Sequence, residues 1–256
     1  MLSQRSSPND KWKIDDMLSS REDLSPFLVH LTRNYHGKTA RENLASVIQE
    51  KTIRFEEAVS AARYSFEWKK MSNAVMRKFF TAVCFTETPL TEIHSCIGIE
   101  KFEIIFQPYG LAFLKNKCVE KGVSPVLYFN DVRGDKDKVV RALCSLAQLD
   151  PSSAAQILPY VSIFGKYLRP TGASHFNEQI MDYTWEREWR YASEESEGFA
   201  FSDEDVFVGL CPHDEIDDFE KQFAPLQFVD PQRNLKRYAE KLTKEEKRTG
   251  VKSGIV

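Results

Sequence analysis

The sequence lacks the short motifs that identify the commonest enzyme classes. It contains no GxxxxGK[ST] or GxGxxG phosphate-binding loop, no HExxH zinc motif and no GxSxG nucleophile turn. No apolar run approaches the roughly 18 residues that a membrane-spanning helix needs, and the residues after Met1 lack the apolar core of a signal peptide. We therefore expect a cytoplasmic protein without a membrane partner, outside the P-loop, Rossmann, zincin and α/β-hydrolase classes.

Cysteine and histidine are too scattered to predict a metal site or a disulfide framework. The five cysteines are odd in number and form no CxxC pair, a pattern typical of reduced cytosolic thiols. None of the five histidines lies at a metal-ligand spacing from another ligand pair. We therefore expect no metal cofactor.

The charge of the chain is unevenly distributed. The 256 residues carry a net charge of −3, but residues 233–256 hold eight Lys/Arg and three Asp/Glu, a local net of +5 that leaves −8 for the rest. We divide the chain into a polar leader (1–24), a single α+β domain (25–232) and a basic C-terminal helix or tail (233–256). Such a tail can contact phosphates, and a solvated helix is the alternative explanation.

Apolar runs and caps predict strands that alternate irregularly with helices. Strands are expected at 26–32, 82–87, 110–114, 125–129, 185–191, 205–210 and 226–229. Helices are expected at 39–51, 136–149, 152–167 and 214–223 and from Pro89 onward, with a capping box at Thr39 and Glu42. A loop is expected at 168–182. Without regular βαβ alternation this pattern favours an α+β fold, a central mixed or antiparallel sheet flanked by helices.

The most informative stretch is residues 185–191, which holds two carboxylates, two guanidiniums and three aromatic rings. Alternate residues of a strand share a face, so Glu186, Glu188 and Arg190 would lie opposite the aromatic side chains. Buried charges are paired or functional, whereas a surface strand with cross-strand ion pairs is the alternative. The full set of candidate polar residues at strand ends is His30, Thr32, Thr86, Glu87, Tyr109, Glu188 and Arg190.

The order of several short motifs resembles the bacterial abortive-infection family AbiGi. The matching pieces are residues 27–32, 43–48, 83–90, 109–115, 125–128 and 186–190, of which Cys-Phe-Thr-Glu and Glu-Arg-Glu-Trp-Arg are the most specific. The family is named as an antitoxin of phage resistance. The resemblance implies phage defence and a possible cognate toxin, antitoxin or chaperone partner, but the name establishes no chemistry.

A second resemblance is to the DarT-like ADP-ribosyltransferases, toxin enzymes that use NAD to modify nucleic acid. It rests on a His-x-Thr strand, a following helix that opens with Asn-Leu, a central strand with a tyrosine and a late strand with a glutamate. It implies an ADP-ribosyltransferase-like split sheet, with NAD as the substrate. The tyrosine-rich strand motif of the DarT proteins is absent here, so the substrate stays open.

That resemblance also implies roles for individual residues. His30 and Thr32 would hold the ribose and the nicotinamide amide, and Glu188 would be the catalytic carboxylate. Tyr109 or Phe113 would stack on the nicotinamide, and Arg33 or Arg190 would bind the pyrophosphate. The alternative for Glu188 is a structural salt bridge to Arg187 or Arg190.

Three functions therefore follow from the sequence. The first is an ADP-ribosyltransferase-like defence protein acting on nucleic acid or protein, and the second is a non-enzymatic antitoxin or partner-binding protein. The third is a nuclease with Glu87, Asp131 and Glu188 on a divalent metal. This last reading lacks a carboxylate pair of persuasive spacing.

Overall fold

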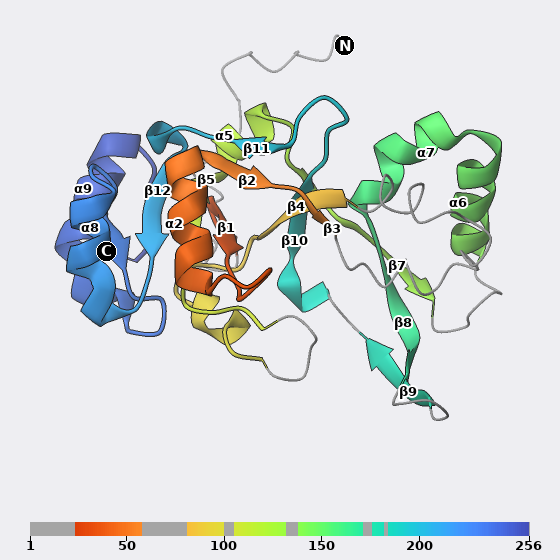
Figure 1. Ribbon diagram of the computed structural model, residues 1–256, viewed down its shortest axis with the longest axis horizontal. Helices are drawn as coiled ribbons and strands as arrows, with labels where there is room; N and C mark the ends of the chain where they lie inside the picture. The colour runs from red at the N-terminus through yellow and green to blue at the C-terminus, as the bar shows by residue number, and fades with distance from the viewer. Residues whose placement is uncertain are drawn as a thin grey trace, which may run out of the picture.

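An eight-stranded, mostly antiparallel sheet forms the centre of the computed structural model (Figure 1). The structure describes residues 24–57, 81–99, 105–131, 138–170, 176–181 and 184–255. Seven strands follow the order β13-β12-β5-β1-β4-β10-β6, and β3 pairs with β4 beside this path; only β12 and β13 run parallel. The strands are β1 (Phe27–Leu31), β3 (Glu56–Glu57), β4 (Thr81–Thr86), β5 (Gly110–Leu114), β6 (Ser124–Pro125), β10 (Glu188–Tyr191), β12 (Val206–Leu210) and β13 (Phe228–Val229).

Two smaller sheets accompany the large one. A two-stranded sheet joins β2 (Thr52–Arg54) to β11 (Gly198–Ala200). The second small sheet has the order β7-β8-β9, with β7 (Leu127–Asp131) parallel to β8 (Val161–Pro170) and β9 (Phe176–Met181) antiparallel to β8. It is built from the chain between β6 and β10, and it lies with α6 (Lys138–Leu149) and α7 (Pro151–Ile157) on the right of Figure 1.

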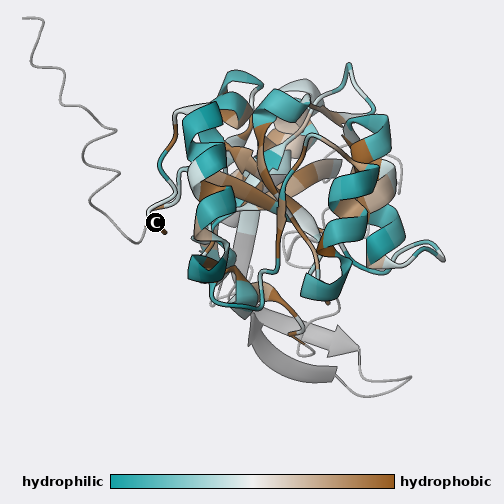
Figure 2. Cartoon of the chain, turned by 90° about the vertical axis from the view of Figure 1, so that its left-hand side faces the viewer, coloured by the Kyte–Doolittle hydropathy of each residue, from teal (hydrophilic) through white to brown (hydrophobic). Residues whose placement is uncertain are grey.

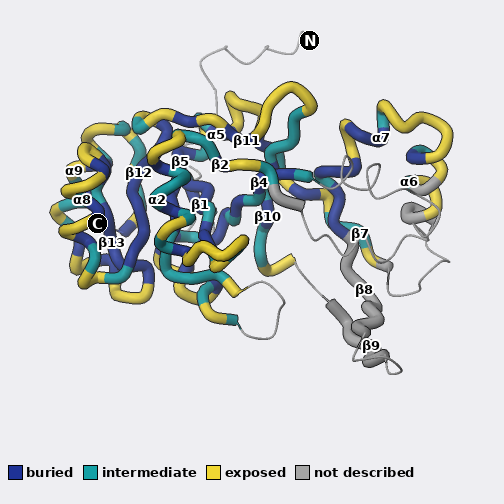
Figure 3. The backbone as a smooth tube through the Cα atoms, in the orientation of Figure 1, coloured by how far each residue is buried: buried dark blue, intermediate teal, exposed yellow. Residues whose placement is uncertain are grey.

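Aromatic side chains fill the core of the large sheet. Phe27 stacks on Phe207 with ring centroids 4.2 Å apart, and Phe113 meets Phe85 and Phe199 edge to face at 5.7 Å each. Edge-to-face geometry is the arrangement that the quadrupole of an aromatic ring favours. The strands are accordingly apolar in Figure 2 and buried in Figure 3, whereas the outward helix surfaces are hydrophilic and exposed.

Helices cover the sheet and close its edge. The capping box of α2 (Ala40–Glu50) is confirmed, since Glu42 N–H donates to Thr39 Oγ1 (3.2 Å) and Thr39 N–H to Glu42 Oε2 (2.7 Å). The other helical segments are η2 (Ile93–Cys96), α5 (Lys115–Glu120), η4 (Leu158–Tyr160), η5 (Thr184–Glu186), η6 (Asp203–Asp205), η7 (His213–Glu215), α8 (Ile216–Gln222), η8 (Leu235–Tyr238) and α9 (Ala239–Thr249). Among the described residues, no helix is both long and apolar enough to cross a membrane.

The α+β class and the mixed, mostly antiparallel sheet are confirmed, but one predicted helix is wrong. The helix expected at 152–167 ends at Ile157, and β8 begins at Val161. Pro159 cannot continue a helix because it lacks an N–H, and β8 gains a parallel partner in β7, 30 or more residues earlier in the chain. The loop expected at 168–182 is likewise wrong, since β8 and β9 occupy most of it; His175 lies outside the described residues.

Three shorter elements also differ from expectation. The strand expected at 125–129 divides between β6 and β7, which belong to different sheets. The helix expected from Pro89 is replaced by the 3₁₀ turn η2, which begins at Ile93. The charged strand is shorter than 185–191, because η5 and a left-handed Arg187 (φ 46°) precede β10.

The C-terminal segment packs on the edge of the large sheet. Leu242 and Glu245 of α9 are buried, and Arg248 donates from Nη2 to the Val206 carbonyl of β12 at 2.6 Å. Lys241 Nζ lies 2.5 Å from Glu220 Oε1 on α8. The region separated in the sequence as a basic helix or tail is thus a helix held against the domain at several points.

Removing the apolar anchor of α9 should destabilise the protein. Leu242 has no exposed surface, so Leu242→Ala should lower the free energy of unfolding by about 2–5 kcal/mol through lost burial and a residual cavity. Urea unfolding followed by circular dichroism measures this change. Lys244→Ala, on the exposed side of the same helix, is the control and should change stability by less than about 0.5 kcal/mol. Equal effects of the two changes would contradict the packing described.

Candidate functional site

Strands β1, β4 and β10 lie side by side and meet at one level of the sheet. Thr86 of β4 pairs with Val29 of β1 on one side and with Glu188 of β10 on the other. β1 shares five residue pairs with β5, and β4 shares four with β10, whereas β1 and β4, both fully described, share only that one pair. The pairing of β1 with β4 is therefore the shortest between the neighbouring strands at this level of the large sheet.

His30 follows Val29 and lies beside β4, on the face opposite Val29. Its Nδ1 is 2.9 Å from the Cys84 carbonyl oxygen of β4, and because a carbonyl only accepts, Nδ1 carries the proton. The imidazole also meets the edge of Phe85 at 5.9 Å. On its other side, a Cβ on Gly110 would lie 2.3 Å from the His30 carbonyl oxygen, so the close approach of β5 requires glycine there.

Glu188 and Arg190 form a buried, two-pronged ion pair on one face of β10. Arg190 Nε donates to Glu188 Oε1 (2.8 Å), and Nη2 donates to Oε2 (2.7 Å). Arg190 Nη1 donates to the carbonyl oxygens of Pro159 (2.7 Å) and Val161 (3.1 Å). The side chains of Arg190 and Glu188 are only 3% and 9% exposed. The shared face that the sequence predicted for these two residues is confirmed.

The buried guanidinium of Arg190 stays protonated because of its pairing with Glu188. Burial alone would lower the pKa of Arg190, but the charge of Glu188 raises the pKa above its usual value. Tyr128 of β7 contributes a further contact, because its hydroxyl accepts from the Glu188 backbone N–H at 2.9 Å. Burial raises the pKa of Tyr128, so this hydroxyl stays protonated. Arg190 and Tyr128 thus connect β10 to the small sheet.

Hydroxyl groups at the end of β4 connect that strand to the turn before β10. Thr86 Oγ1 donates to the Glu186 carbonyl oxygen (2.6 Å) and lies 2.7 Å from Thr88 Oγ1. Since the Thr86 proton is already donated, the Thr88 hydroxyl donates to Thr86 Oγ1. Cys96 in turn donates from Sγ to Thr88 Oγ1 at 3.6 Å. These hydrogen bonds hold the backbone carbonyl of Glu186 in place next to the end of β4.

Glu186 is a half-buried carboxyl next to the charged pair. Burial, and next the negative charge of Glu188, raise the pKa of Glu186 to about 8. At neutral pH, Glu186 is therefore largely protonated, whereas Glu188 is paired with a cation. Two carboxyl groups two residues apart are held in different environments, which is an arrangement suited to different roles in one reaction.

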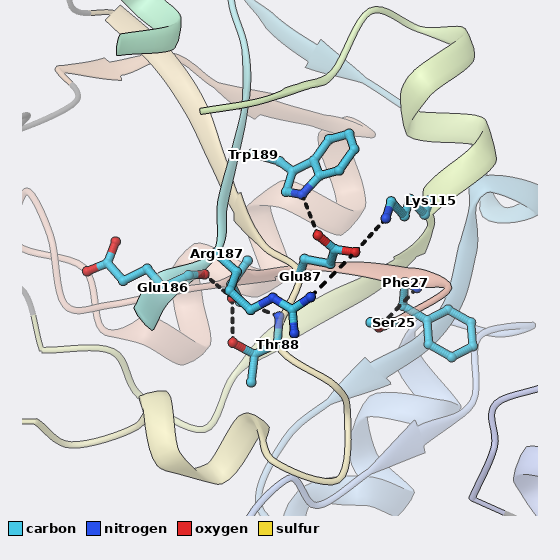
Figure 4. Close-up of polar contacts among 9 residues, drawn as sticks. Ser25, Phe27, Glu87, Thr88, Lys115, Glu186, Arg187 and Trp189 are labelled. Carbon is cyan, nitrogen blue, oxygen red and sulfur yellow. Dashed lines mark hydrogen bonds and ion pairs between the residues drawn. The ribbon is translucent and has the colours of Figure 1, made fainter. Parts of the chain in front are cut away.

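A second polar cluster surrounds Glu87, on the face opposite Glu188. Lys115 Nζ lies 2.5 Å from Glu87 Oε1, Trp189 Nε1 donates to Oε2 at 2.9 Å, and Arg187 Nη2 is 4.0 Å from Oε1 (Figure 4). The ammonium of Lys115 also lies 4.7 Å from the Trp189 ring centroid. Glu87 is 8% exposed, and three side chains surround it.

The remaining predicted residues lie in other parts of the structure. The Thr32 hydroxyl is buried and donates to the Ala40 carbonyl (2.9 Å), which joins β1 to α2. Tyr109 donates its hydroxyl to Glu215 Oε1 (2.6 Å). The Arg33 guanidinium lies over the Tyr35 ring at 4.5 Å. Phe113 is fully buried among core rings, so no free ring face is left there for a nicotinamide.

The structure thus places the strands of His30 and Glu188 on either side of β4, but the side chain of His30 lies with Phe85 on the face opposite Glu188. Tyr109 and Phe113 also lie apart from the polar group of Glu188. Sequence reasoning missed Tyr128 and Thr88, and it assigned Glu186 a face without a role. The signal for Glu186 and Thr88 is their two-residue spacing from Glu188 and Thr86. Tyr128 carries no such signal, because its contact crosses between sheets.

The metal-dependent alternative finds no support in the described part of the chain. No group of three potential metal ligands occurs among the described residues. Glu87 and Glu188 are paired with Lys115 and Arg190 on opposite faces, and the side chain of Asp131 lies outside the description.

The raised pKa of Glu186 predicts a specific pH dependence of stability. The folded state binds this proton more tightly than the unfolded state, whose carboxyl has a pKa near 4.5. The contribution of Glu186 is therefore fully present below about pH 4.5 and is lost as the pH rises through about 8. Glu186→Gln should gain stability relative to wild type between pH 5.5 and pH 8.5, measured by urea unfolding. Glu195→Gln, an exposed control, should show the same pH dependence of the free energy of unfolding as wild type. If Glu186→Gln also shows the wild-type pH dependence, the raised pKa is refuted.

A family model described as "Putative abortive phage resistance protein AbiGi, antitoxin" matches residues 54–204 of the chain. These residues include β4, the small sheet and β10, and hence most of the polar site. No curated protein and no solved structure matches the chain significantly. Because the matched region spans more than half of the sequence, the chain belongs to the AbiGi family of abortive phage resistance proteins.

Proposed function

We propose that this phage-defence protein transfers ADP-ribose from NAD to nucleic acid or protein, at the polar site of β4 and β10. The observation that carries the proposal is the buried ion pair of Glu188 with Arg190, next to the half-buried carboxyl of Glu186. The register of Val29, Thr86 and Glu188 places these three side chains on one face of the sheet. His30 follows Val29 and contacts Phe85, so it lies on the opposite face, and the proposed substrate contacts Glu188 and Glu186 rather than His30.

The chemistry requires a stable carboxylate close to the reacting sugar. Cleavage of the bond between nicotinamide and ribose develops positive charge on the ribose, as in glycoside hydrolysis. Arg190 binds both oxygens of Glu188 and orients this side chain in a region of low water access, where electrostatic stabilisation is strongest. Arg190 is then a positioning residue, because its donors are already engaged by Glu188 and two carbonyl groups.

Glu186 supplies the complementary function. With a pKa of about 8 it exchanges a proton near neutral pH, which suits a general acid or base that serves the acceptor. His30 donates its Nδ1–H to the Cys84 carbonyl and lies on the opposite face from Glu188, so it has no direct role in this proposal. Thr32 and Phe113 have no direct role in this proposal, because their groups are engaged inside the fold.

The direct test measures NAD binding and nicotinamide release by the full-length protein. Calorimetric titration with NAD should show binding, and nicotinamide should appear when a bacterial extract supplies the acceptor. Glu188→Gln should reduce release by about 10²–10³-fold, because it removes the charge that stabilises the transition state. Glu195→Gln makes the same chemical change at an exposed position and should leave release unchanged.

Glu188→Gln also leaves a buried guanidinium without its carboxylate, which costs about 3–5 kcal/mol. The variant must therefore be shown to be folded by thermal denaturation. Glu186→Gln breaks no ion pair of the described structure and provides a second, independent variant. Wild-type protein that neither binds NAD nor releases nicotinamide with any extract would refute the transferase.

A second candidate is an antitoxin that acts by protein contact alone. The family description favours it, and so does the Glu188–Arg190 pair, whose charges are satisfied by internal partners and need no substrate. On this reading the cognate partner is a toxin. Co-expression separates the two candidates: an antitoxin is harmless alone, rescues growth from its toxin and copurifies with it. Toxicity of the protein expressed alone, abolished by Glu188→Gln, supports the transferase instead.

A further inference from the structure

The C-terminal segment presents a row of exposed cations that the site does not use. η8 is followed directly by α9, and Lys252 follows that helix. Among the described residues, five exposed cations of this segment have no ion-pair partner. We name this set the basic face: Lys236, Arg237, Lys244, Lys247 and Lys252.

The basic face is held in a fixed orientation by the opposite side of the helix. Leu242 is buried, and Glu245 is buried and paired with Arg248, which itself donates to β12. Beyond the helix, Ser253 donates from N and Oγ to Glu246 Oε1 at 2.7 and 2.6 Å, and Ile255 is buried. The backbone that carries the cations is therefore anchored on both sides of Gly250.

The ordinary electrostatics of a helix explain only part of this charge. Lys247 lies in the last turn of α9, where a cation is favoured by the helix dipole. Lys236 and Arg237 lie just before the first turn, at the positive end of the same dipole, where cations are disfavoured. Glu240 is the exposed acid of this segment, so the face keeps a clear positive excess. An anionic partner would offset this unfavourable arrangement.

We propose that the basic face binds the phosphate backbone of nucleic acid without reading its sequence. η8 and α9 together extend roughly 25 Å, a length over which one strand of a duplex carries about seven phosphates. Four of the five cations are lysines, which act as point charges towards phosphate. Tyr238 is the aromatic residue of this segment and is buried, so no ring is presented for base stacking. The remaining chain carries a net charge of −8, so its overall charge does not favour a polyanion.

The proposal is independent of the transferase chemistry and is tested on the full-length protein. A fluorescein-labelled 20-base-pair DNA of arbitrary sequence is titrated by anisotropy between 50 and 200 mM KCl. The variant Lys236→Gln, Lys244→Gln, Lys247→Gln should bind at least tenfold more weakly at 50 mM. The slope of log K against log salt should fall by about two to three, nearly one for each phosphate contact removed. A second arbitrary sequence should bind within about twofold of the first, as a contact confined to phosphates requires.

The matched control carries Lys38→Gln, Lys117→Gln and Lys121→Gln, the same loss of charge on other surfaces. It should bind DNA as wild type does. Equal loss of binding in both variants would reduce the effect to net charge and overturn the proposal, as would absence of wild-type binding at 50 mM KCl. Sedimentation analysis addresses the other occupant, an acidic surface of a second copy. A wild-type dimer that the basic-face variant converts to monomer would also overturn it.

Discussion

The guanidinium of Arg190 contacts both the large sheet and the small one. Within β10 it binds both oxygens of Glu188, and across the fold it binds the carbonyl oxygens of Pro159 and Val161. A buried cation without these acceptors would be far more costly than an apolar residue. The segment that carries the Pro159 and Val161 carbonyl groups must therefore pack at a fixed position next to β10. The orientation of the Glu188 side chain depends on that same contact.

The short pairing of β1 with β4 leaves backbone groups that side chains near β1, β4 and β10 can bond. Where two strands stay fully paired, as β1 and β5 do, the ladder satisfies the backbone and the side chains fill an apolar core. Beyond the single pair of Val29 and Thr86, the ladder between β1 and β4 is missing, and the His30 ring bonds the Cys84 carbonyl instead. At the end of β4 the hydroxyls of Thr86 and Thr88 add further side-chain bonds, including one from Thr86 to the Glu186 carbonyl.

Sequence patterns correctly predicted the strands and helices that are determined by a few adjacent residues. The apolar run of β1, the strand β5 and the capping box of α2 follow from a few adjacent residues. The error at β8 has a different origin, since its parallel partner β7 is distant in the chain and no local pattern reports it. For the site, the alternation of residues 188–191 correctly placed Glu188 and Arg190 on one buried face. The raised pKa of Glu186 and the contact of Tyr128 depend on neighbours that only the tertiary fold supplies.

The attachment of the small sheet through Arg190 and Tyr128 has a thermodynamic consequence. Both contacts end on β10, so a displacement of η4 or β7 changes the acceptors of Arg190 or the partner of the Glu188 backbone. Linkage requires the converse with equal free energy: whatever alters the charge or bonding of Glu188 also shifts the equilibrium position of the small sheet. The sheet formed by β7, β8 and β9 is therefore energetically coupled to β10, and each reports on the state of the other.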